Sequence, residues 1–186
     1  MQCRLATLND LDVIMKLYES ARDFMIKNGN PHQWGDNNWP PPELLKSDIK
    51  KSQCYVCIHN EKIAGVFVYI YGRDCDPTYL KINDGTWLDE SAYGVVHRLA
   101  TDGKTRGVGS FCLNWCYEKA GHLRLDTHGD NRPMQSLVKK LGFVHCGTIF
   151  VKEDSYPRLA FEKSSLTEKL QKNRLTTVLS GGPFPT

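Results

Sequence analysis

The chain has 186 residues, enough for one medium-sized domain and too few for two of ordinary size. Apolar residues make up 40% of it, so it can form a real core, and global disorder is not expected. The formal net charge of +3, with no run of five Lys or Arg residues, argues against nucleic acid as a partner.

The sequence also argues against a membrane partner. The longest apolar stretch, at 63–71, is interrupted by glycine and is far too short to cross a bilayer. Residues 1–6 lack the hydrophobic run of a signal peptide and include Arg4. We therefore expect a cytoplasmic protein.

Seven cysteines, an odd number, are scattered through segments that read as regular structure. Cys54-x-x-Cys57 is the one spacing typical of a metal or redox site. It falls in an expected strand, where an offset of three places the two side chains on opposite faces. No second CxxC or His pair completes a zinc site. We expect buried, reduced thiols and no metal.

The hydrophobic patterns and turn signals predict one continuous α/β domain. In chain order the expected elements are a strand at 2–6, a helix that Asn9 or Asp10 can cap and Asn28-Gly29 ends, a helix at 43–51, strands at 54–59, 63–71 and 93–101, a helix from Arg106 or Gly107 to 119, a strand at 123–127, a helix capped by Asp130 or Asn131, and strands at 143–151 and 155–163. The hairpins at 54–71 and 143–163 predict a mixed sheet.

The C-terminal end is expected to lie outside this domain. Ser165-x-x-Glu168 is a capping-box pattern and predicts a short terminal helix. A flexible tail is expected to follow it, over 179–186. The expected division is a domain at 1–163 and an extension at 164–186.

Two irregular segments are open to two interpretations each. The loop at 30–42 carries Trp34 and Trp39 among polar residues and prolines. It either covers a small hydrophobic cluster or forms the substrate-binding wall of an acceptor pocket. The segment at 72–91 is rich in Asp and Glu. It is either a solvated surface loop or an acidic rim that attracts a cationic substrate.

The segment at 102–110 joins a strand to a helix through glycines and predicts an anion site. The first N–H groups of a helix have no partner within the helix, and the helix dipole adds positive potential there. Lys104 and Arg106 contribute formal charge. The loop therefore suits a pyrophosphate, although neither the Walker A motif nor the GxGxxG fingerprint is present.

Residues 104–109, Lys-Thr-Arg-Gly-Val-Gly, resemble the Q/R-x-x-G-x-G/A motif of the GNAT superfamily of N-acetyltransferases. The preceding strand, from His97 to Thr101, is similar to the strand that the family places there. The family's downstream helix motif is matched by Asn131, Leu137, Lys140, Gly142 and Phe143. More narrowly, the residues from Asp126 to Gln135 resemble a bacterial subgroup of unknown substrate.

The resemblance implies an α/β (α+β) GNAT fold. Its mixed central sheet would have about seven strands, splayed between strands 4 and 5 and flanked by four helices, with the short C-terminal helix in addition. It also implies acetyl-CoA as co-substrate, with the pyrophosphate on the loop amides and the pantetheine along the end of the fourth strand. The implied cofactor-binding residues are Leu99, Ala100, Thr101, Lys104, Thr105, Arg106, Gly107, Val108, Gly109, Ser110 and Asn131.

The chain departs from the family pattern in three places. The loop after Thr101 is about two residues short, so that either Lys104 or Arg106 fills the first position of the motif. The Tyr that often serves the family as a general acid falls on Val138, which cannot donate a proton. The alanine frequently found three residues after the motif Asn is Met134.

Acetyl transfer to a primary amine needs a group that accepts a proton, directly or through water. Asp126 lies where some family members carry a strand glutamate that acts as base, and it is the first candidate. The alternative is a structural role, in which Asp126 hydrogen-bonds the end of the neighbouring helix or forms an ion pair with Arg124 or Arg132. His97 is the second candidate, because an imidazole titrates near neutrality. A strand His is otherwise often structural.

The leading hypothesis is an acetyl-CoA-dependent N-acetyltransferase that works by direct attack of the amine. The acceptor is a small-molecule amine or a peptide amine, with a small cationic amine favoured by the acidic segment. One alternative is a non-catalytic sensor or assembly module that binds acyl-CoA with the same fold. Another is a plain nucleotide-binding α/β domain, against which the mixed sheet argues. A homodimer is compatible with the edge strands.

Overall fold

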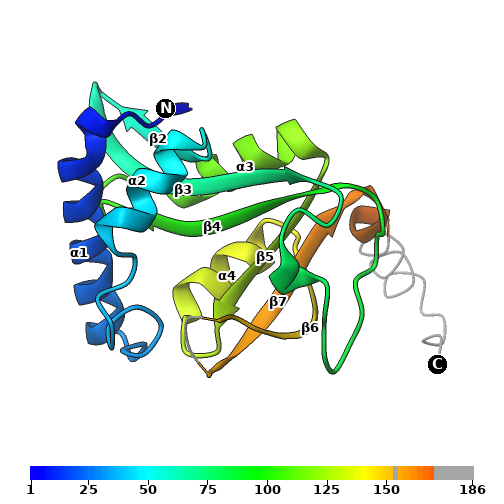
Figure 1. The fold of residues 1–186 in the computed structure, drawn as a ribbon. Helices are drawn as coiled ribbons and strands as arrows, with labels where there is room; N and C mark the ends of the chain where they lie inside the picture. The colour runs from blue at the N-terminus through cyan, green and yellow to red at the C-terminus, as the bar shows by residue number, and fades with distance from the viewer. Residues whose placement is uncertain (153–154, 170–186) are drawn as a thin grey trace.

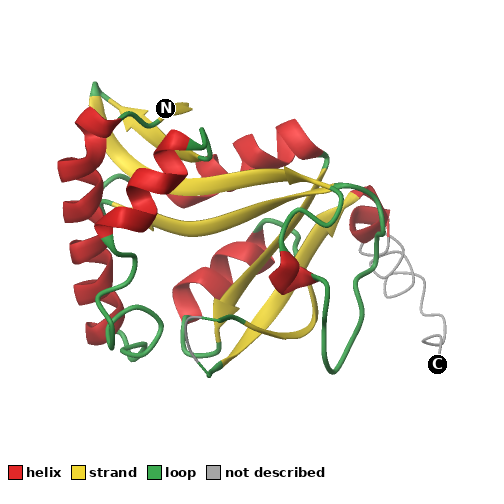
Figure 2. Cartoon of the chain, in the orientation of Figure 1, coloured by secondary structure: helices red, strands yellow, loops and turns green. Residues whose placement is uncertain are grey.

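The computed structural model describes residues 1–152 and 155–169 and contains one seven-stranded mixed sheet (Figures 1 and 2). The strands are β1 (Gln2–Leu5), β2 (Cys54–His59), β3 (Lys62–Gly72), β4 (Tyr93–Thr101), β5 (His122–His128), β6 (Val144–Phe150) and β7 (Pro157–Ser164), and the helices are α1 (Leu11–Lys27), α2 (Pro42–Lys50), α3 (Val108–Ala120) and α4 (Arg132–Lys140). The strand order is β1-β2-β3-β4-β5-β7-β6. The predicted mixed sheet with four flanking helices is confirmed.

Two layers of helix cover the sheet. On one face, α1 and α2 bury Ile14, Tyr18 and Leu45 against β2, β3 and β4. On the other face, α3 and α4 bury Cys112 and Val138 against β3, β4, β5 and β7. The alternation of strand residues between these two clusters follows from the two-residue period of a strand.

The hairpin of β2 and β3 turns at Asn60 and Glu61, whose φ angles of 47° and 61° are both left-handed. A two-residue turn of this kind matches the right-handed twist of the paired strands. As expected, Cys54 and Cys57 of β2 are buried in different clusters on opposite faces of the sheet.

The strands β4 and β5 part along most of their length. They are parallel and pair at Gly94 with Leu123 and at Val95 with Arg124. Beyond these pairs the two strands diverge, as Figures 1 and 2 show. The predicted splay between strands 4 and 5 is confirmed, and it leaves the backbone of β4 from Val96 onward unpaired with β5.

A bulge in β4 lies at the mouth of this gap. Val66 of β3 pairs with Ala100 and Val68 pairs with His97, so that two residues of β4, Arg98 and Leu99, stand opposite one residue of β3. Arg98 has a φ of 53°, and its carbonyl accepts a 2.8 Å hydrogen bond from the Tyr18 hydroxyl. Bulges bend a strand and re-aim its side chains.

The segment at 72–91 is largely at the surface but is anchored to the sheet by buried aromatic side chains. Tyr79 and Trp87 are buried, stack on each other with ring centroids 5.6 Å apart, and join the third cluster of the core. The backbone N–H of Leu88 donates a 2.6 Å hydrogen bond to Glu162 of β7. The segment is therefore fixed to the sheet, and its acidic residues have defined positions.

Residues 165–169 form a turn of helix after β7, but the cap lies one residue earlier than the sequence predicted. The Ser164 hydroxyl accepts hydrogen bonds from the N–H groups of Leu166 and Thr167, while Glu168 accepts one from the Tyr117 hydroxyl at 2.9 Å. The expected tail at 179–186 is outside the described residues. Over the described ranges, no helix is long and apolar enough to pass through a bilayer.

Candidate active site

A cavity of about 330 Å³ opens where β4 and β5 diverge. It brings together residues from β4, β5, α4, the tryptophan loop and the acidic segment. Among its lining residues are both candidate proton acceptors, both loop tryptophans and two of the expected cofactor-binding residues, namely Asp126, His97, Trp34, Trp39, Leu99 and Asn131. The sequence predictions therefore converge on one place in the fold.

His97 pairs with Asp76, a residue that the sequence analysis did not single out. The imidazole Nε2 lies 2.5 Å from the Asp76 carboxylate, and both side chains are largely buried. Burial by itself raises the pKa of Asp76, but the hydrogen bond and charge of His97, together with Thr78, bring it down to about 2. Since Asp76 is ionised, Nε2 carries the proton, and in a neutral ring the acceptor lone pair is on Nδ1.

Asp126 lies on β5, opposite His97 across the gap. Its carboxylate accepts a 2.6 Å hydrogen bond from the hydroxyl of Tyr79. Burial, and then the neighbouring Asp126 charge, raise the pKa of Tyr79 well above its ordinary value. Tyr79 therefore stays protonated and acts as a fixed donor, which orients Asp126 into the cavity.

A further ion pair borders the cavity. Arg98 of the bulge is partly buried and donates a 2.7 Å hydrogen bond to the buried Asp48 of α2. The bulge turns Arg98 away from the β3 register and toward α2. Asp48, like Asp76 and Tyr79, was missed in the sequence, because its role depends on a partner 50 residues away.

Trp34 and Trp39 fit both interpretations of their loop, as a cover for a hydrophobic cluster and as a wall of the pocket. Trp34 is buried in the core and packs edge-on against Tyr18, with ring centroids 5.6 Å apart. Trp39 is partly buried against the same cluster. Both also line the cavity, so that one loop closes the core and forms a wall of the pocket.

The glycine loop lies exposed at the start of α3. Asp102 accepts hydrogen bonds from the N–H groups of Lys104 and Thr105 and from the Thr105 hydroxyl, at 3.0, 2.9 and 2.7 Å. Two of the expected anion-binding amides are therefore already engaged. Gly107, the residue before α3, has a φ of 81°, which favours glycine.

The amides that follow are open. Within the described part of the chain, the N–H groups of residues 106–110 donate to no protein acceptor. They point the positive end of α3 toward solvent, and the side chains of Lys104 and Arg106 are exposed beside them. Val108, in contrast, has a buried side chain, and Gly109 packs against Leu137 of α4.

The end of β4 pairs on one side alone. Ala100 and Thr101 pair with Val66 and Gly65 of β3, and their register with β5 has already ended. Leu99 lines the cavity, Ala100 is buried and Thr101 is half-buried. An extended molecule with amide groups can therefore pair with the free backbone of β4.

Asn131 is the N-cap of α4. Its Oδ1 accepts from the N–H of Met134 at 3.2 Å, and its Nδ2 donates to Gln33 at 2.9 Å. Gln33 in turn accepts from Asn30. A ligand that binds Asn131 has to displace or share the contact with Gln33.

Val138, the position of the family's frequent Tyr, is fully buried in the core with Leu125 and Phe143. A side chain there does not reach the cavity. As for metal ligands, among the described residues the one group of Cys, His, Asp and Glu side chains close enough to hold an ion lies outside the cavity, at Cys3, Cys57 and Cys112.

Solved structures with the same arrangement are known. A GNAT-family acetyltransferase from Streptococcus agalactiae is 32% identical, with 88% of this chain and 95% of that chain covered and a TM-score of 0.79. A Staphylococcus aureus protein, provisionally assigned as an acetyltransferase, is 26% identical, with 88% and 99% covered and a TM-score of 0.62. The ribosomal-protein-alanine N-acetyltransferase of Brucella melitensis shares the fold at 15% identity, with 88% and 99% covered and a TM-score of 0.60.

No protein-family model matches the chain, and neither does any curated protein sequence. The Streptococcus structure nevertheless covers 88% of this chain, and its 32% identity indicates a common family and not just a shared fold. Together with the splayed sheet and the exposed glycine loop, this match shows that the chain belongs to the GNAT family of acetyltransferases.

Proposed function

We propose that this protein transfers the acetyl group of acetyl-CoA to a primary amine on a small cationic molecule, by direct attack of that amine. The observation that carries the proposal is the cavity in the splayed sheet, which places the His97–Asp76 pair and the Tyr79–Asp126 pair together. The first pair suits proton acceptance and the second suits recognition of positive charge.

The proposed CoA site combines the glycine loop with the free side of β4. The open amides at 106–110 and the exposed cations Lys104 and Arg106 would hold the diphosphate. The unpaired backbone of Leu99, Ala100 and Thr101 would pair with the pantetheine amides. Asp102 supports this site indirectly, since its hydrogen bonds to Lys104 and Thr105 shape the turn.

His97 is the proposed proton acceptor. An amine is mostly protonated near neutrality and has to lose a proton before it attacks. Asp76 holds the imidazole by Nε2 and neutralises the imidazolium that forms, as a carboxylate does for a catalytic histidine in other enzymes. This reverses the order in which the sequence ranked Asp126 and His97.

Asp126 is the proposed anchor for the acceptor. The neutral Tyr79 hydroxyl satisfies part of its hydrogen-bonding capacity and brings no positive charge of its own. Trp34 and Trp39 add aromatic surface to the same cavity, and aromatic faces attract cations. Anionic and aromatic groups together favour a small cationic amine over a neutral or acidic one.

Direct attack is favoured over an acyl-enzyme. Neither Cys nor Ser occurs among the described residues that line the cavity, and its side-chain hydroxyls are those of Thr78 and Thr127. Release of the thiolate would proceed without a Tyr from α4, because position 138 is a buried Val.

The test combines binding with turnover. CoA should raise the melting temperature in a concentration-dependent manner. With acetyl-CoA, CoA thiol should be released in the presence of a diamine or polyamine. Release should be slower with a monoamine that carries no second positive charge. Asp126→Asn should raise KM for the cationic amine, whereas His97→Gln should lower kcat by about 100-fold.

Three results would contradict parts of the proposal. If CoA does not raise the melting temperature, the proposed CoA site is wrong. A shift without thiol release for any amine would instead support a sensor that binds acyl-CoA without turnover. If Asp126→Asn leaves KM for cationic amines unchanged, the proposed anchor is wrong.

A further inference from the structure

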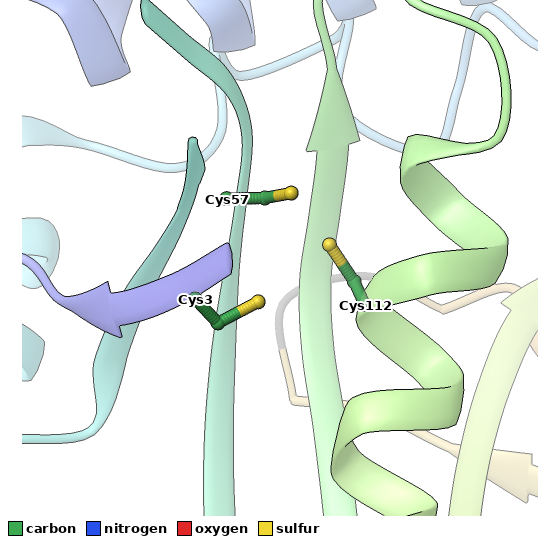
Figure 3. Close-up of side chains that lie close together, drawn as sticks. All are labelled: Cys3, Cys57 and Cys112. Atoms are coloured by element: carbon green, nitrogen blue, oxygen red, sulfur yellow. The ribbon is translucent and has the colours of Figure 1, made fainter. Parts of the chain in front are cut away.

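Three of the seven cysteines converge from distant parts of the sequence. Cys3 lies on β1, Cys57 on β2 and Cys112 on α3, and their sulfur atoms all lie within 4.8 Å of one another. Figure 3 shows the three thiols pointing toward each other from separate elements. Cys57 and Cys112 are fully buried, whereas Cys3 is partly exposed.

Two features of the fold bring the three sulfur atoms together. Cys3 and Cys57 are directly paired in the antiparallel ladder of β1 and β2, so their side chains emerge on the same face of the sheet. Gly65 of β3 stands opposite Cys57, and a Cβ there would lie 2.6 Å from a methyl carbon of Val108. Glycine at 65 therefore lets the first turn of α3 approach the sheet and bring Cys112 over the pair.

We propose that Cys3, Cys57 and Cys112 form a three-thiolate binding site for a soft d10 metal ion, either monovalent copper or zinc. Thiolate sulfur is the ligand that selects these ions. Metal–sulfur bonds of about 2.3 Å place three sulfurs about 4.0 Å apart in a trigonal shell and about 3.8 Å apart in a tetrahedral one. The observed cluster reaches either spacing with a contraction of less than about 1 Å.

The site differs from the CxxC pair considered in the sequence. Cys54 points to the opposite face of β2 and takes no part in it. The described residues supply no fourth Cys, His, Asp or Glu ligand to the cluster, so that three sulfurs would complete a trigonal copper site. Zinc prefers four ligands and would take water or another exogenous ligand at the partly exposed side, near Cys3.

Binding follows a balanced exchange of protons for metal. Each S–H bond that breaks leaves its electron pair on sulfur, which forms a bond to the ion, and up to three protons pass to the solvent buffer. No oxidation state changes. Cys3 is the one partly exposed member of the cluster, and an ion would therefore enter from its side.

Such an ion would tie the edge strand and its neighbour to a helix. It would join β1 and β2 to α3 close to the end that carries the glycine loop. Because unfolding separates the three sulfurs, the ion would bind the folded chain in preference to the unfolded one and would raise its melting temperature. This consequence does not depend on acetyl transfer.

The experiment uses the full chain, reduced and freed of metal under anaerobic conditions. One arm titrates Cu(I) against a chromophoric Cu(I) chelator, and the other titrates Zn²⁺ against a zinc chelator. We expect one ion per chain in at least one arm, with sulfur-to-metal charge-transfer absorption in the copper arm. Cys3→Ala and Cys112→Ala should each weaken binding by on the order of 100-fold.

Cys54→Ala is the matched control, because Cys54 is also fully buried on β2 but lies outside the cluster. It should bind one ion with unchanged affinity. Circular dichroism of each metal-free variant checks folding, and Cys3→Ala, at a partly exposed position on an edge strand, carries the test if Cys112→Ala does not fold. Equal binding by wild type and by the triple Ala variant of the cluster, or no binding in either arm, would overturn the proposal.

Discussion

Asp76→Asn is the substitution that tests the His97–Asp76 pair most directly. Asn has the shape of Asp, and its side-chain oxygen can still accept the 2.8 Å hydrogen bond from the N–H of Thr78 that begins the 3₁₀ turn at Pro77–Tyr79. What it loses is the negative charge beside the imidazole. The variant therefore separates the electrostatic role of Asp76 from its structural one.

The size of the effect follows from the pKa of Asp76, which falls from an ordinary 3.8 to about 2 even though burial opposes the change. This change corresponds to about 2 kcal/mol, to which His97 contributes first and Thr78 second. Asn keeps the Thr78 hydrogen bond, so that losing half to nearly all of this energy in a transition state with protonated His97 lowers kcat/KM by about 5- to 30-fold.

The measurement is CoA thiol release by the wild type and by Asp76→Asn at one pH near neutrality, over a range of amine concentrations that gives kcat/KM for each.

Asp74→Asn is the matched control, since it removes the same charge from the same segment at an exposed position with a φ of 50° that Asn tolerates. Its kcat/KM should equal that of the wild type. A kcat/KM within twofold of the wild type in Asp76→Asn would show that the charge of Asp76 does not support His97 as the base.

Three other substitutions have defined outcomes. Glu162→Gln removes the buried carboxylate that binds Arg124, and it should lower the unfolding free energy by about 3–5 kcal/mol in urea denaturation. Gly107→Ala places a Cβ at a φ of 81°, costs about 1 kcal/mol and should weaken the CoA-dependent thermal shift. Arg4→Met should cost about 0.5–1 kcal/mol at pH 7, because Arg4 is partly exposed, and this cost should vanish in acid as pH falls through the depressed pKa of its partner Asp10.

The sequence predicted those parts of the molecule that depend on neighbours along the chain. The glycines at 107 and 121 border α3, and Asn131 begins α4 with the cap bond that its residue type favours. The alternation of apolar residues placed Cys54 and Cys57 on opposite faces. Each of these features follows from the local backbone, which the residue types determine within a few positions.

One member of each proposed catalytic pair was predicted from the sequence, because each pair joins a regular strand to an irregular segment. His97 and Asp126 lie on strands and could be placed by pattern and family resemblance. Asp76 and Tyr79 lie in a segment with no periodicity, and Tyr79 meets Asp126 across 47 residues. The presence of Tyr79 and Trp87 among the acids was the available signal that this segment packs against the sheet.

The three-thiol cluster could not be predicted from the sequence pattern. Its members are separated by more than 50 residues along the chain, and the spacing that did attract attention, Cys54-x-x-Cys57, contributes a single thiol to it. A strand register, a glycine on the next strand and the position of a helix all have to be known before the three sulfurs can be placed together.

The buried charge cluster around Glu162 links the stability of the fold to the proposed chemistry. Glu162 accepts hydrogen bonds from His122 and Arg124 on β5 at 2.6 and 3.2 Å, and from the N–H of Leu88 in the acidic segment. Burying these charges is costly, and the geometry offsets that cost only while all partners stay in place. One carboxylate thus holds together the strand that carries Asp126 and the segment that carries Tyr79. Loss of Glu162 should disturb the 2.6 Å contact between those two side chains before the sheet itself unfolds, and activity should therefore fall at temperatures where the far-ultraviolet circular dichroism is still native.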